Sequence, residues 1–421
     1  MKQIIFILFI IFINSYAHVA IPPQIKDIEH ISQNFETYKL DANISFVKYQ
    51  QNFLLKYYEP WNENLKLDIE SFENGAKYTA TDKIYFGENK REISKHFKDI
   101  QNINENKLSF PSVSKNAITI RNTDCRHLPT NKPFFKPDGY PFDRLQNSMI
   151  HINTPIKVLH FSADKEYAFV QSSYVSGWIK SNDLAYISDE DIKKIKSLKP
   201  IVTTTDGISI VDKNDNFISK AYIGSIFWAD NQNTLFIVKA DANSNAILIQ
   251  TSMNRALQQL PIEFKQENIY KIAKELYAQN YGWGGYLENR DCSMLMRDFY
   301  VTFGIYLPRN SYDQISDNNS EMISLENKTI EEKREIIKKN AKPFATLIYM
   351  KGHIMMYIGM LDGNPIIYHS SWGVKIKNKE KVIIGGSFVT SLLPGIELED
   401  FDEKGGTLFD KITYLRIFKD N

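Results

Sequence analysis

Cys292 is one of only two cysteines in the chain, and its sequence neighbourhood favours nucleophilic chemistry. Residues 294–303 carry a large apolar side chain at every fourth position, which predicts a helix. Asp291 is a suitable N-cap for that helix, and Gly304 is a suitable C-cap. The thiol then lies in the first turn, where the helix dipole and free backbone N–H groups favour a thiolate. A thiolate placed in this way is the nucleophile of covalent acyl transfer.

A thiol nucleophile needs a general base, and two of the eight histidines lie in the same C-terminal region as Cys292. His353 opens a strand-like run at 354–358, and His369 ends the next such run. If the two strands pair antiparallel, one histidine could accept the thiol proton while the other fixes its ring tautomer. A catalytic zinc site built from the same three side chains is a competing interpretation. The chain has no HExxH pairing to support it, so we expect no metal and no cofactor.

The elements that must position these side chains form an α+β pattern over residues 259–421. A helical pattern at 269–276 leads into the glycine-rich segment 281–285, and the Cys292 helix follows. Strand-like runs lie at 346–349, 354–358 and 365–368. The charged stretch 328–339 predicts a solvated surface helix. Helices first and antiparallel strands later predict an α+β catalytic domain.

Three further regions precede this domain. Residues 18–108 are polar and rich in Asn, Lys and Glu, and the pattern at 92–103 is helical, which predicts a helical domain that packs on the others. Residues 109–188 and 189–258 contain short alternating β runs separated by turn residues, which predict two small barrels. We expect the charged stretch 189–199 to link the barrels.

The first 17 residues predict a secretory signal peptide. A basic start precedes the apolar run 4–13, and small residues fit cleavage after Ala17. This run is too short to span a bilayer comfortably, and no later stretch is long and apolar enough, so we expect an exported protein without a membrane anchor. The net charge of +1 gives no electrostatic footprint for nucleic acid. A disulfide between Cys125 and Cys292 would remove the nucleophile, so we expect two free thiols, with Cys125 packed in a core.

Several short motifs stand in a characteristic order along the chain. They are Tyr281-Gly282-Trp283-Gly284-Gly285, Asp291-Cys292-Ser293, Leu307-Pro308-Arg309-Asn310-Ser311 with Gln314, Gly352-His353, and His369. In these types and this order they resemble the NlpC family of papain-like cell-wall cysteine peptidases. Residues 121–129 and 141–148 resemble the first of two bacterial SH3-like domains of a four-part subgroup, and 57–61 resembles part of its N-terminal domain. The resemblance spans nearly the whole mature chain.

The resemblance implies a fold class as well as an activity. The fold would be multidomain α+β, with a helical N-terminal region, two small SH3-like β-barrels and a papain-like, NlpC-type catalytic domain. Cys292 would be the nucleophile, His353 the general base and His369 the orienting third residue. The family cleaves the amide between γ-D-glutamate and a diamino acid such as meso-diaminopimelate in peptidoglycan stem peptides. Members whose SH3-like domain blocks one end of the groove often require a free N-terminal L-alanine, and the expected location is periplasmic or secreted.

The local chemistry suits such a substrate. Arg309 offers a planar fork for the α-carboxylate of a γ-linked glutamate, with Ser311 as a further donor. Asp291 could pair with an alanine ammonium group, assisted by Ser293, or act only as a helix cap. Tyr281 is expected to form a hydrogen bond in the cleft. The backbone N–H of the nucleophile would contribute to an oxyanion hole.

Other features leave alternatives open. Asp124, Arg126 and Asp143 of the first barrel could line the groove. Met294 stands where many family members have glycine, which changes the packing under the nucleophile but leaves the catalytic positions intact. A wall-binding protein with an inactive peptidase domain is a second possible function, although all three catalytic residues are present. A papain-like amidase or acyltransferase acting on another amide or on lipid is a third, which Arg309 and the barrels disfavour.

Overall fold

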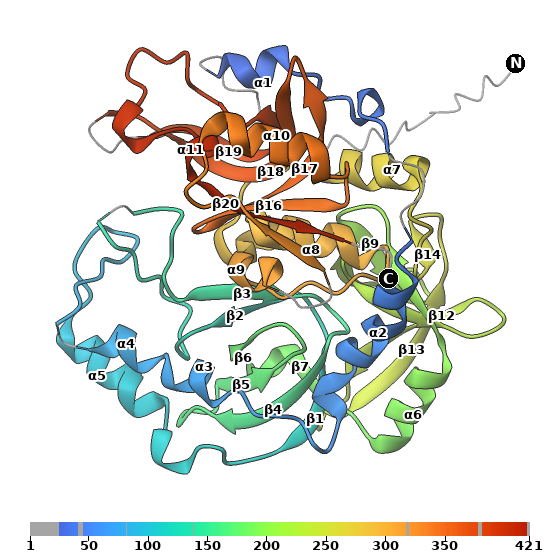
Figure 1. Cartoon of the computed structure of the whole chain (residues 1–421). Helices are drawn as coiled ribbons and strands as arrows, with labels where there is room; N and C mark the ends of the chain where they lie inside the picture. Colours follow the sequence, from blue (N-terminus) through green and yellow to red (C-terminus); the bar gives the residue numbers. More distant parts are fainter. Residues whose placement is uncertain are drawn as a thin grey trace, which may run out of the picture.

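The computed structural model describes residues 25–40, 45–80, 82–137, 139–316, 320–377 and 381–418. The predicted signal peptide, 1–17, lies outside these residues. No helix within the described ranges has the length and apolar character needed to cross a membrane. Figure 1 shows α2 (Val47–Tyr57) to α5 (Lys95–Asn104), in blue to cyan, beside two β regions in teal and green, with the α+β C-terminal region above them and α1 (Lys26–His30) beside that region.

The N-terminal region is built from short helices, as predicted. These are α1 (Lys26–His30), η1 (Phe35–Thr37), α2 (Val47–Tyr57), η2 (Glu59–Trp61), α3 (Ile69–Glu73), α4 (Ala76–Thr79), α5 (Lys95–Asn104) and η3 (Lys107–Ser109). The helix expected at 92–103 is α5. Around η2, Trp61 donates to the carbonyl of Ala117 at 2.8 Å, and the Tyr58 hydroxyl accepts from Trp228 at 2.8 Å. One turn of this region therefore contacts both β regions, which makes it a packing element.

The first β region is a seven-stranded antiparallel sheet in the order β3-β2-β6-β5-β4-β1-β7. Its strands are β1 (Lys115–Thr119), β2 (Thr123–Arg126), β3 (Gln146–Ile150), β4 (Pro155–Phe161), β5 (Tyr167–Gln171), β6 (Ser176–Lys180) and β7 (Leu184–Tyr186), with the turn η4 (Ser181–Asp183) between the last two. Buried aliphatic side chains such as Ile156, Val158 and Val170 fill its interior, together with Cys125. The barrel predicted for this region is confirmed.

The second β region follows a helix where a linker was expected. The charged stretch forms α6 (Asp189–Ser197), whose N-cap Ser188 accepts from the N–H of Asp191 and whose acidic first turn suits the helix dipole. The strands are β8 (Lys199–Thr203), β9 (Ile208–Val211), β10 (Phe217–Ala221), β11 (Ile226–Ala229), β12 (Thr234–Ala240), β13 (Ala246–Ser252) and β14 (Leu257–Gln259). They form a five-stranded sheet, β13-β12-β11-β8-β14, and a separate β10-β9 pair.

The C-terminal region combines helices with a six-stranded antiparallel sheet in the order β15-β20-β16-β17-β18-β19. The strands are β15 (Glu321–Ser324), β16 (Thr346–Met350), β17 (His353–Leu361), β18 (Asn364–Lys375), β19 (Lys381–Ser391) and β20 (Ile412–Ile417). The helices are α7 (Gln266–Leu276), η5 (Trp283–Glu288), α8 (Cys292–Val301), α9 (Ser311–Ile315), α10 (Ile330–Asn340), η7 (Glu403–Gly405) and α11 (Leu408–Lys411). Helix α8 packs on β17 and β18, so the cysteine and both histidines belong to contacting elements. The predicted α+β arrangement is confirmed.

Candidate active site

Cys292 is the first residue of α8, and it is 8% exposed. The preceding residue, Asp291, is extended, and its side chain accepts from the N–H of Met294 at 2.9 Å, so it is the predicted N-cap. The helix ends at Val301, two residues before the predicted end. Gly304 follows with φ +70, a conformation that glycine adopts without strain.

Asp291 is the centre of a dense hydrogen-bond network. Its carboxylate accepts from the N–H groups of Met294 and Gly284, from Ser293 Oγ, and from both terminal nitrogens of Arg309 at 3.1 and 2.7 Å. Burial raises the pKa of this carboxyl, but Arg309 and the hydrogen bonds outweigh burial, so its pKa is lowered. The helix-cap role is thus the one that the geometry displays, and contact with a substrate ammonium group stays a prediction.

The Arg309 side chain is more buried, and has more hydrogen-bond partners within the protein, than the sequence suggested. Besides Asp291 it binds Ser293 Oγ through Nη1 at 2.7 Å and Ser148 Oγ, on β3 of the first barrel, through Nε at 2.7 Å. The side chain is 4% exposed. Four of its five N–H groups therefore have partners within the described chain, which leaves one for a substrate oxygen. The expectation of an open fork for a substrate carboxylate is corrected, because Asp291 occupies the fork.

The two histidines are adjacent, as predicted from their strand positions. His353 Nε2 lies 2.8 Å from His369 Nδ1, and His369 Nε2 lies 3.1 Å from Thr390 Oγ1. If Nε2 of His353 carries the hydrogen of this contact, Nδ1 is left to accept a proton. Backbone N–H groups of Ile354 and Ser293 act on the Cys292 sulfur, which places the thiol beside the start of β17.

The protonation states follow from burial. Burial raises the pKa of the Cys292 thiol to about 12, and the nearby Asp291 charge adds to this, while backbone N–H groups only partly offset it. Burial also lowers the pKa of His353 to about 4. At neutral pH the resting pair is therefore a thiol beside a neutral imidazole. The expected thiolate is corrected, because burial outweighs the stabilising effect of the helix start.

All the candidate site residues line one cavity of about 730 Å³. They are Cys292, His353 and His369 with Tyr281, Asp291, Ser293, Arg309 and Ser311. Ser311 begins α9, and Tyr281 lies with its ring 5.8 Å from that of Trp372 on β18. The separate sequence motifs thus converge on a single cleft.

The first barrel forms one wall of the cleft. Phe142 and Arg144 line the cavity, and the Phe142 ring makes edge contacts with Trp283 at 5.2 Å and Trp372 at 6.3 Å. Tyr140 makes a further edge contact with Trp372 at 5.7 Å. These contacts join the loop before β3 to the catalytic region, so the barrel narrows the groove.

Three polar residues expected on this wall lie behind it. Arg126 pairs with Asp143 at 2.9 Å and donates to Gln146 Oε1 at 2.9 Å, while Gln146 Nε2 donates to Asp124 at 2.8 Å. Gln146 lines the cavity and also donates to the carbonyl of Gly284. The open alternative that Asp124, Arg126 and Asp143 line the groove is not what the structure shows, because the three orient Gln146, which does line it.

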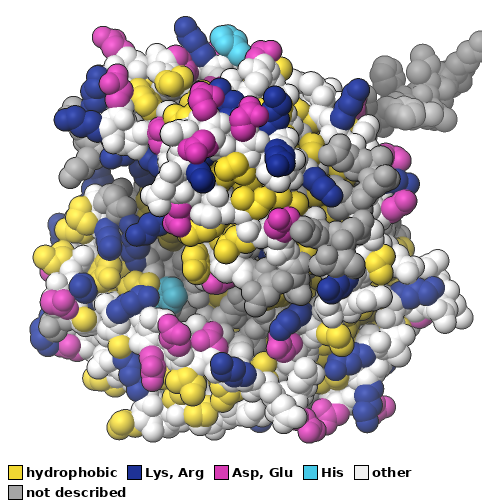
Figure 2. All heavy atoms as spheres, in the orientation of Figure 1, with side chains coloured by type: hydrophobic (Ala, Val, Ile, Leu, Met, Phe, Trp, Pro, Cys, Tyr) yellow, Lys and Arg dark blue, Asp and Glu magenta, His cyan; other side chains and the backbone are white. Residues whose placement is uncertain are grey.

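The cleft is rich in positive charge. Five cationic side chains line it, Arg144, Arg309, Lys375, Lys381 and Lys411, against two carboxylates, Asp291 and Asp402. Lys375 pairs with Asp402 at 2.9 Å, and the Lys381 ammonium lies 4.5 Å from the Phe142 ring. Figure 2 shows Lys and Arg side chains gathered beside the hollow between the catalytic region and the first barrel. The balance favours an anionic ligand.

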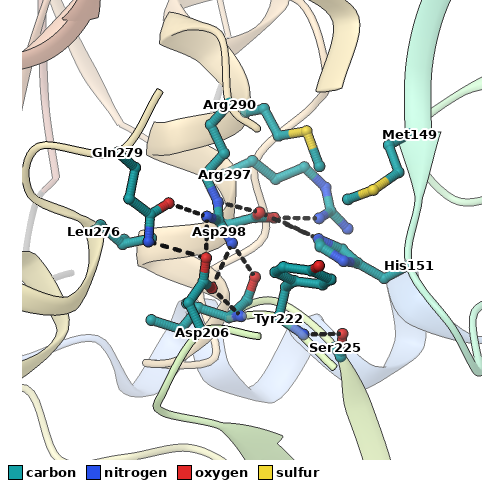
Figure 3. A network of polar contacts seen from close by, with 12 residues as sticks. Met149, His151, Asp206, Tyr222, Ser225, Leu276, Gln279, Arg290, Arg297 and Asp298 are labelled. Atoms are coloured by element: carbon teal, nitrogen blue, oxygen red, sulfur yellow. Dashed lines mark hydrogen bonds and ion pairs between the residues drawn. The ribbon is translucent and has the colours of Figure 1, made fainter. Parts of the chain in front are cut away.

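A buried network of ion pairs and hydrogen bonds surrounds Asp298 of α8 (Figure 3). Arg290 binds Asp206 of the second barrel at 2.7 and 2.8 Å and Asp298 of α8 at 2.8 Å. Asp298 also accepts from His151 of the first barrel at 3.0 Å and from Arg297 at 3.2 Å. Because Arg290 immediately precedes the N-cap, the network links both barrels to the position of the nucleophile.

Met294 fills the space under Cys292, at the position where the sequence resemblance led us to expect glycine in many relatives. It is 1% exposed, and its Sδ lies 2.7 Å from where a Cβ on Gly285 would be. Gly285 has φ +79, so the glycine-rich segment needs both the conformation and the absent side chain. Both thiols are free, and Cys125 is buried in the first barrel, as predicted.

The sequence interpretation missed several residues at this site. Thr390, Trp372 and Gln146 lie on strands β19, β18 and β3, whose pairing could not be predicted. The β-branched residues at 382–384 and 389–390 were a usable indication of β19. No sequence pattern pointed to Gln146, since its role depends on docking of the barrel. Among the described residues, no group of three or more His, Cys, Asp and Glu side chains is arranged to hold a metal.

Comparisons with known protein families divide the chain into three matched segments. The NlpC/P60 family matches residues 278–390, which include all the candidate site residues. An SH3 domain of the SH3b1 type matches 131–180 within the first barrel. The N-terminal NLPC_P60 stabilising domain matches 4–107. No curated protein matches the chain.

One solved structure shares the fold of most of the chain. An NlpC/P60 endopeptidase from Photobacterium damselae subsp. piscicida superposes with a TM-score of 0.83 at 22% identity, covering 92% of this chain and 97% of its own. An NlpC/P60 family protein from Bacillus cereus ATCC 10987 has a TM-score of 0.46 at 13% identity, covering 72% of this chain and 99% of its own. The first likeness extends over every region described above and shows a shared fold.

Proposed function

Because three segments of the chain match the NlpC/P60 family, its N-terminal stabilising domain and an SH3b1-type domain, we propose that the protein is a cysteine peptidase that cleaves the γ-D-glutamyl–meso-diaminopimelate amide of peptidoglycan stem peptides. The observation that carries the proposal is the convergence of Cys292, His353 and His369 in one cleft. Cys292 is the nucleophile, His353 the general base and His369 the orienting residue. The signal-peptide pattern at 1–17 supports a periplasmic or secreted enzyme.

The reaction follows from the neutral resting pair. As the Cys292 sulfur attacks the amide carbonyl, its proton passes to Nδ1 of His353, and a C–S bond forms. The oxyanion is stabilised by the backbone N–H of Cys292. The imidazolium then protonates the departing amine of the diamino acid, and the C–N bond breaks. Water, deprotonated by His353, hydrolyses the thioester and regenerates the thiol.

The wall formed by the first barrel supports short substrates with a free N-terminus. Phe142 and Tyr140 contact Trp372 across the cleft, so a long glycan-linked peptide meets an obstruction where a released peptide can end. The L-alanine ammonium group would lie near Asp291 and Tyr281. Ser311 and the remaining N–H of Arg309, two residues that line the cavity, would bind the α-carboxylate of the γ-linked glutamate.

The excess of cationic side chains in the cleft supports the same substrate class. A stem peptide carries several carboxylates, from γ-linked glutamate and from the diamino acid. Arg144, Lys375, Lys381 and Lys411 line the cavity together with Arg309, against the carboxylates of Asp291 and Asp402. Such a lining attracts a polyanionic peptide and disfavours a lipid substrate.

The experiment compares L-Ala-γ-D-Glu-meso-diaminopimelate with its N-acetylated form, using mature protein that begins at His18 and a Cys292→Ala control. Products are read by mass spectrometry. Release of L-Ala-D-Glu from the free-amine peptide alone is expected. Cleavage of both forms would overturn the free-amine requirement and point to intact wall as substrate. No cleavage of either peptide would overturn the proposal and favour a binding protein or an amidase with another substrate.

A further inference from the structure

The histidine pair continues into a third buried group, the hydroxyl of Thr390 on β19. Thr390 Oγ1 lies 3.1 Å from His369 Nε2 and donates its hydrogen to the carbonyl of Ser391 at 2.7 Å. Thr390 is 0% exposed, so water does not substitute for either contact. A hydroxyl has a single hydrogen, so Oγ1 can only accept a hydrogen bond from the histidine ring.

This constraint sets which atom is the donor in each of the two hydrogen bonds that join Thr390, His369 and His353. His369 must carry its hydrogen on Nε2, because that atom faces an acceptor, and its Nδ1 is then the acceptor. His369 Nδ1 lies 2.8 Å from His353 Nε2, so His353 must carry its hydrogen on Nε2. The lone pair of His353 is left on Nδ1, the atom required to take the proton of Cys292.

We propose that Thr390 is a positioning residue that selects the reactive tautomer of His353 by acting through His369. The opposite direction would place a hydrogen on Nδ1 of His353, and the ring could then accept no proton from the thiol. The inference rests on the proposed function, since it assigns a base to that reaction. A wrong tautomer at a catalytic histidine slows catalysis strongly in other nucleophilic enzymes.

The N-terminal region holds Thr390 in place from outside the sheet. β19 is last in the sheet order, and both neighbours of Thr390 are bound on its outer side. Ser391 donates from its backbone N–H and its Oγ to Asp27, both at 2.9 Å. Val389 and Gln33 exchange two hydrogen bonds, of 2.9 and 2.8 Å. The segment that carries α1 therefore fixes the end of the strand from which the tautomer is set.

The test replaces Thr390→Val, which keeps the shape but loses the hydroxyl, and Thr390→Ser, which retains it. With L-Ala-γ-D-Glu-meso-diaminopimelate, the valine variant is expected to lose about tenfold or more in kcat at similar KM. The serine variant should recover most of this loss. A kcat for the valine variant within twofold of the original protein would overturn the proposal. Thermal unfolding of each variant establishes that it is folded.

A second readout does not depend on any substrate. In full-length Cys292→Ala protein labelled with ¹⁵N-histidine, NMR assigns which nitrogen of His353 and His369 carries hydrogen at neutral pH. Hydrogen on Nε2 of both rings is expected, with a shift toward the other tautomer in the valine variant. Hydrogen on Nδ1 of His353 in the starting protein, or an unchanged spectrum in the valine variant, would overturn the proposal. If the peptide is not cleaved at all, the proposed function fails while this measurement still decides the tautomer.

Discussion

At the level of single residues, the site depends on how burial sets protonation. Burial raises the pKa of Cys292 and lowers the pKa of His353, so the two groups are neutral together over a wide pH range. Proton transfer then accompanies the attack of sulfur on the amide. As a direct consequence, His353 stays unprotonated at moderately acidic pH.

We therefore expect kcat/KM to stay level from neutral pH down to about 5 and to fall as pH drops through about 4, where His353 becomes protonated. The measurement is kcat/KM for the free-amine peptide between pH 3.5 and 8. Enzyme held at each acidic pH and then assayed at pH 7 separates titration from unfolding. A reversible loss centred near pH 6.5 would contradict this prediction, because it would mean that His353 titrates like an exposed imidazole.

At the level of elements, the parts of the site that come from one element were predictable and the parts that come from pairing were not. The position of Cys292 at a helix start follows from Asp291 and the apolar spacing behind it, and the adjacency of the histidines follows from two strand ends. The occupied fork of Arg309 was not predictable, because its pairing with Asp291 depends on how two separate elements pack, and its Nε contact with Ser148 comes from a barrel strand 161 residues earlier. The thiolate expectation failed because a local pattern contains no information about burial.

The strands, too, were predictable only where their own sequence favours a strand. Strands rich in β-branched residues, such as β4 and β12, were found, whereas the polar strands β2 and β3 were missed because their sequences, with residues such as Asp124 and Asn147, match turns. These strands are stabilised by burial against the catalytic region. Their register, and hence the place of Gln146, is a property of docking between regions.

The ionic network around Asp298 leads to a prediction about the free energy of unfolding. Asp298 is 0% exposed and faces three basic side chains, so Asp298→Asn leaves buried cations without their anion. We expect a loss of about 3–5 kcal/mol in the free energy of unfolding, measured by urea denaturation. The matched control is Asp99→Asn, which removes an exposed pair with Lys95 and should change stability by about 0.5 kcal/mol or less. A loss below about 1 kcal/mol for Asp298→Asn would show that the network does not hold the regions together.

At the level of the whole molecule, the regions act as one catalytic unit. The N-terminal region contacts both barrels through η2 and holds β19 through Asp27 and Gln33. The first barrel supplies a wall of the cleft, and the second supplies Asp206 to the network beneath it. Substitutions far from Cys292 should therefore alter the geometry of the cleft through these contacts.

Buried titratable groups distributed over the regions make stability depend on pH. Burial lowers the pKa of His127 to about 3 and of His353 to about 4, and it lowers the pKa of His369 well below its usual value. Below pH 6.5 the unfolded chain binds protons that the folded protein excludes, so these three groups destabilise the fold as pH falls. Glu105 acts oppositely, because burial raises its pKa to about 7 and the folded protein takes up a proton first.

Removing one of these groups should therefore change how the free energy of unfolding differs between pH 7 and 5.5. Urea midpoints at both pH values measure the change. His127→Gln should remove about 1 kcal/mol of the difference, whereas Glu105→Gln should enlarge it, because the opposing group is lost. These two variants move the pH dependence in opposite directions while each changes one buried side chain. Equal pH dependence in both would mean that neither group titrates differently in the folded and unfolded chains.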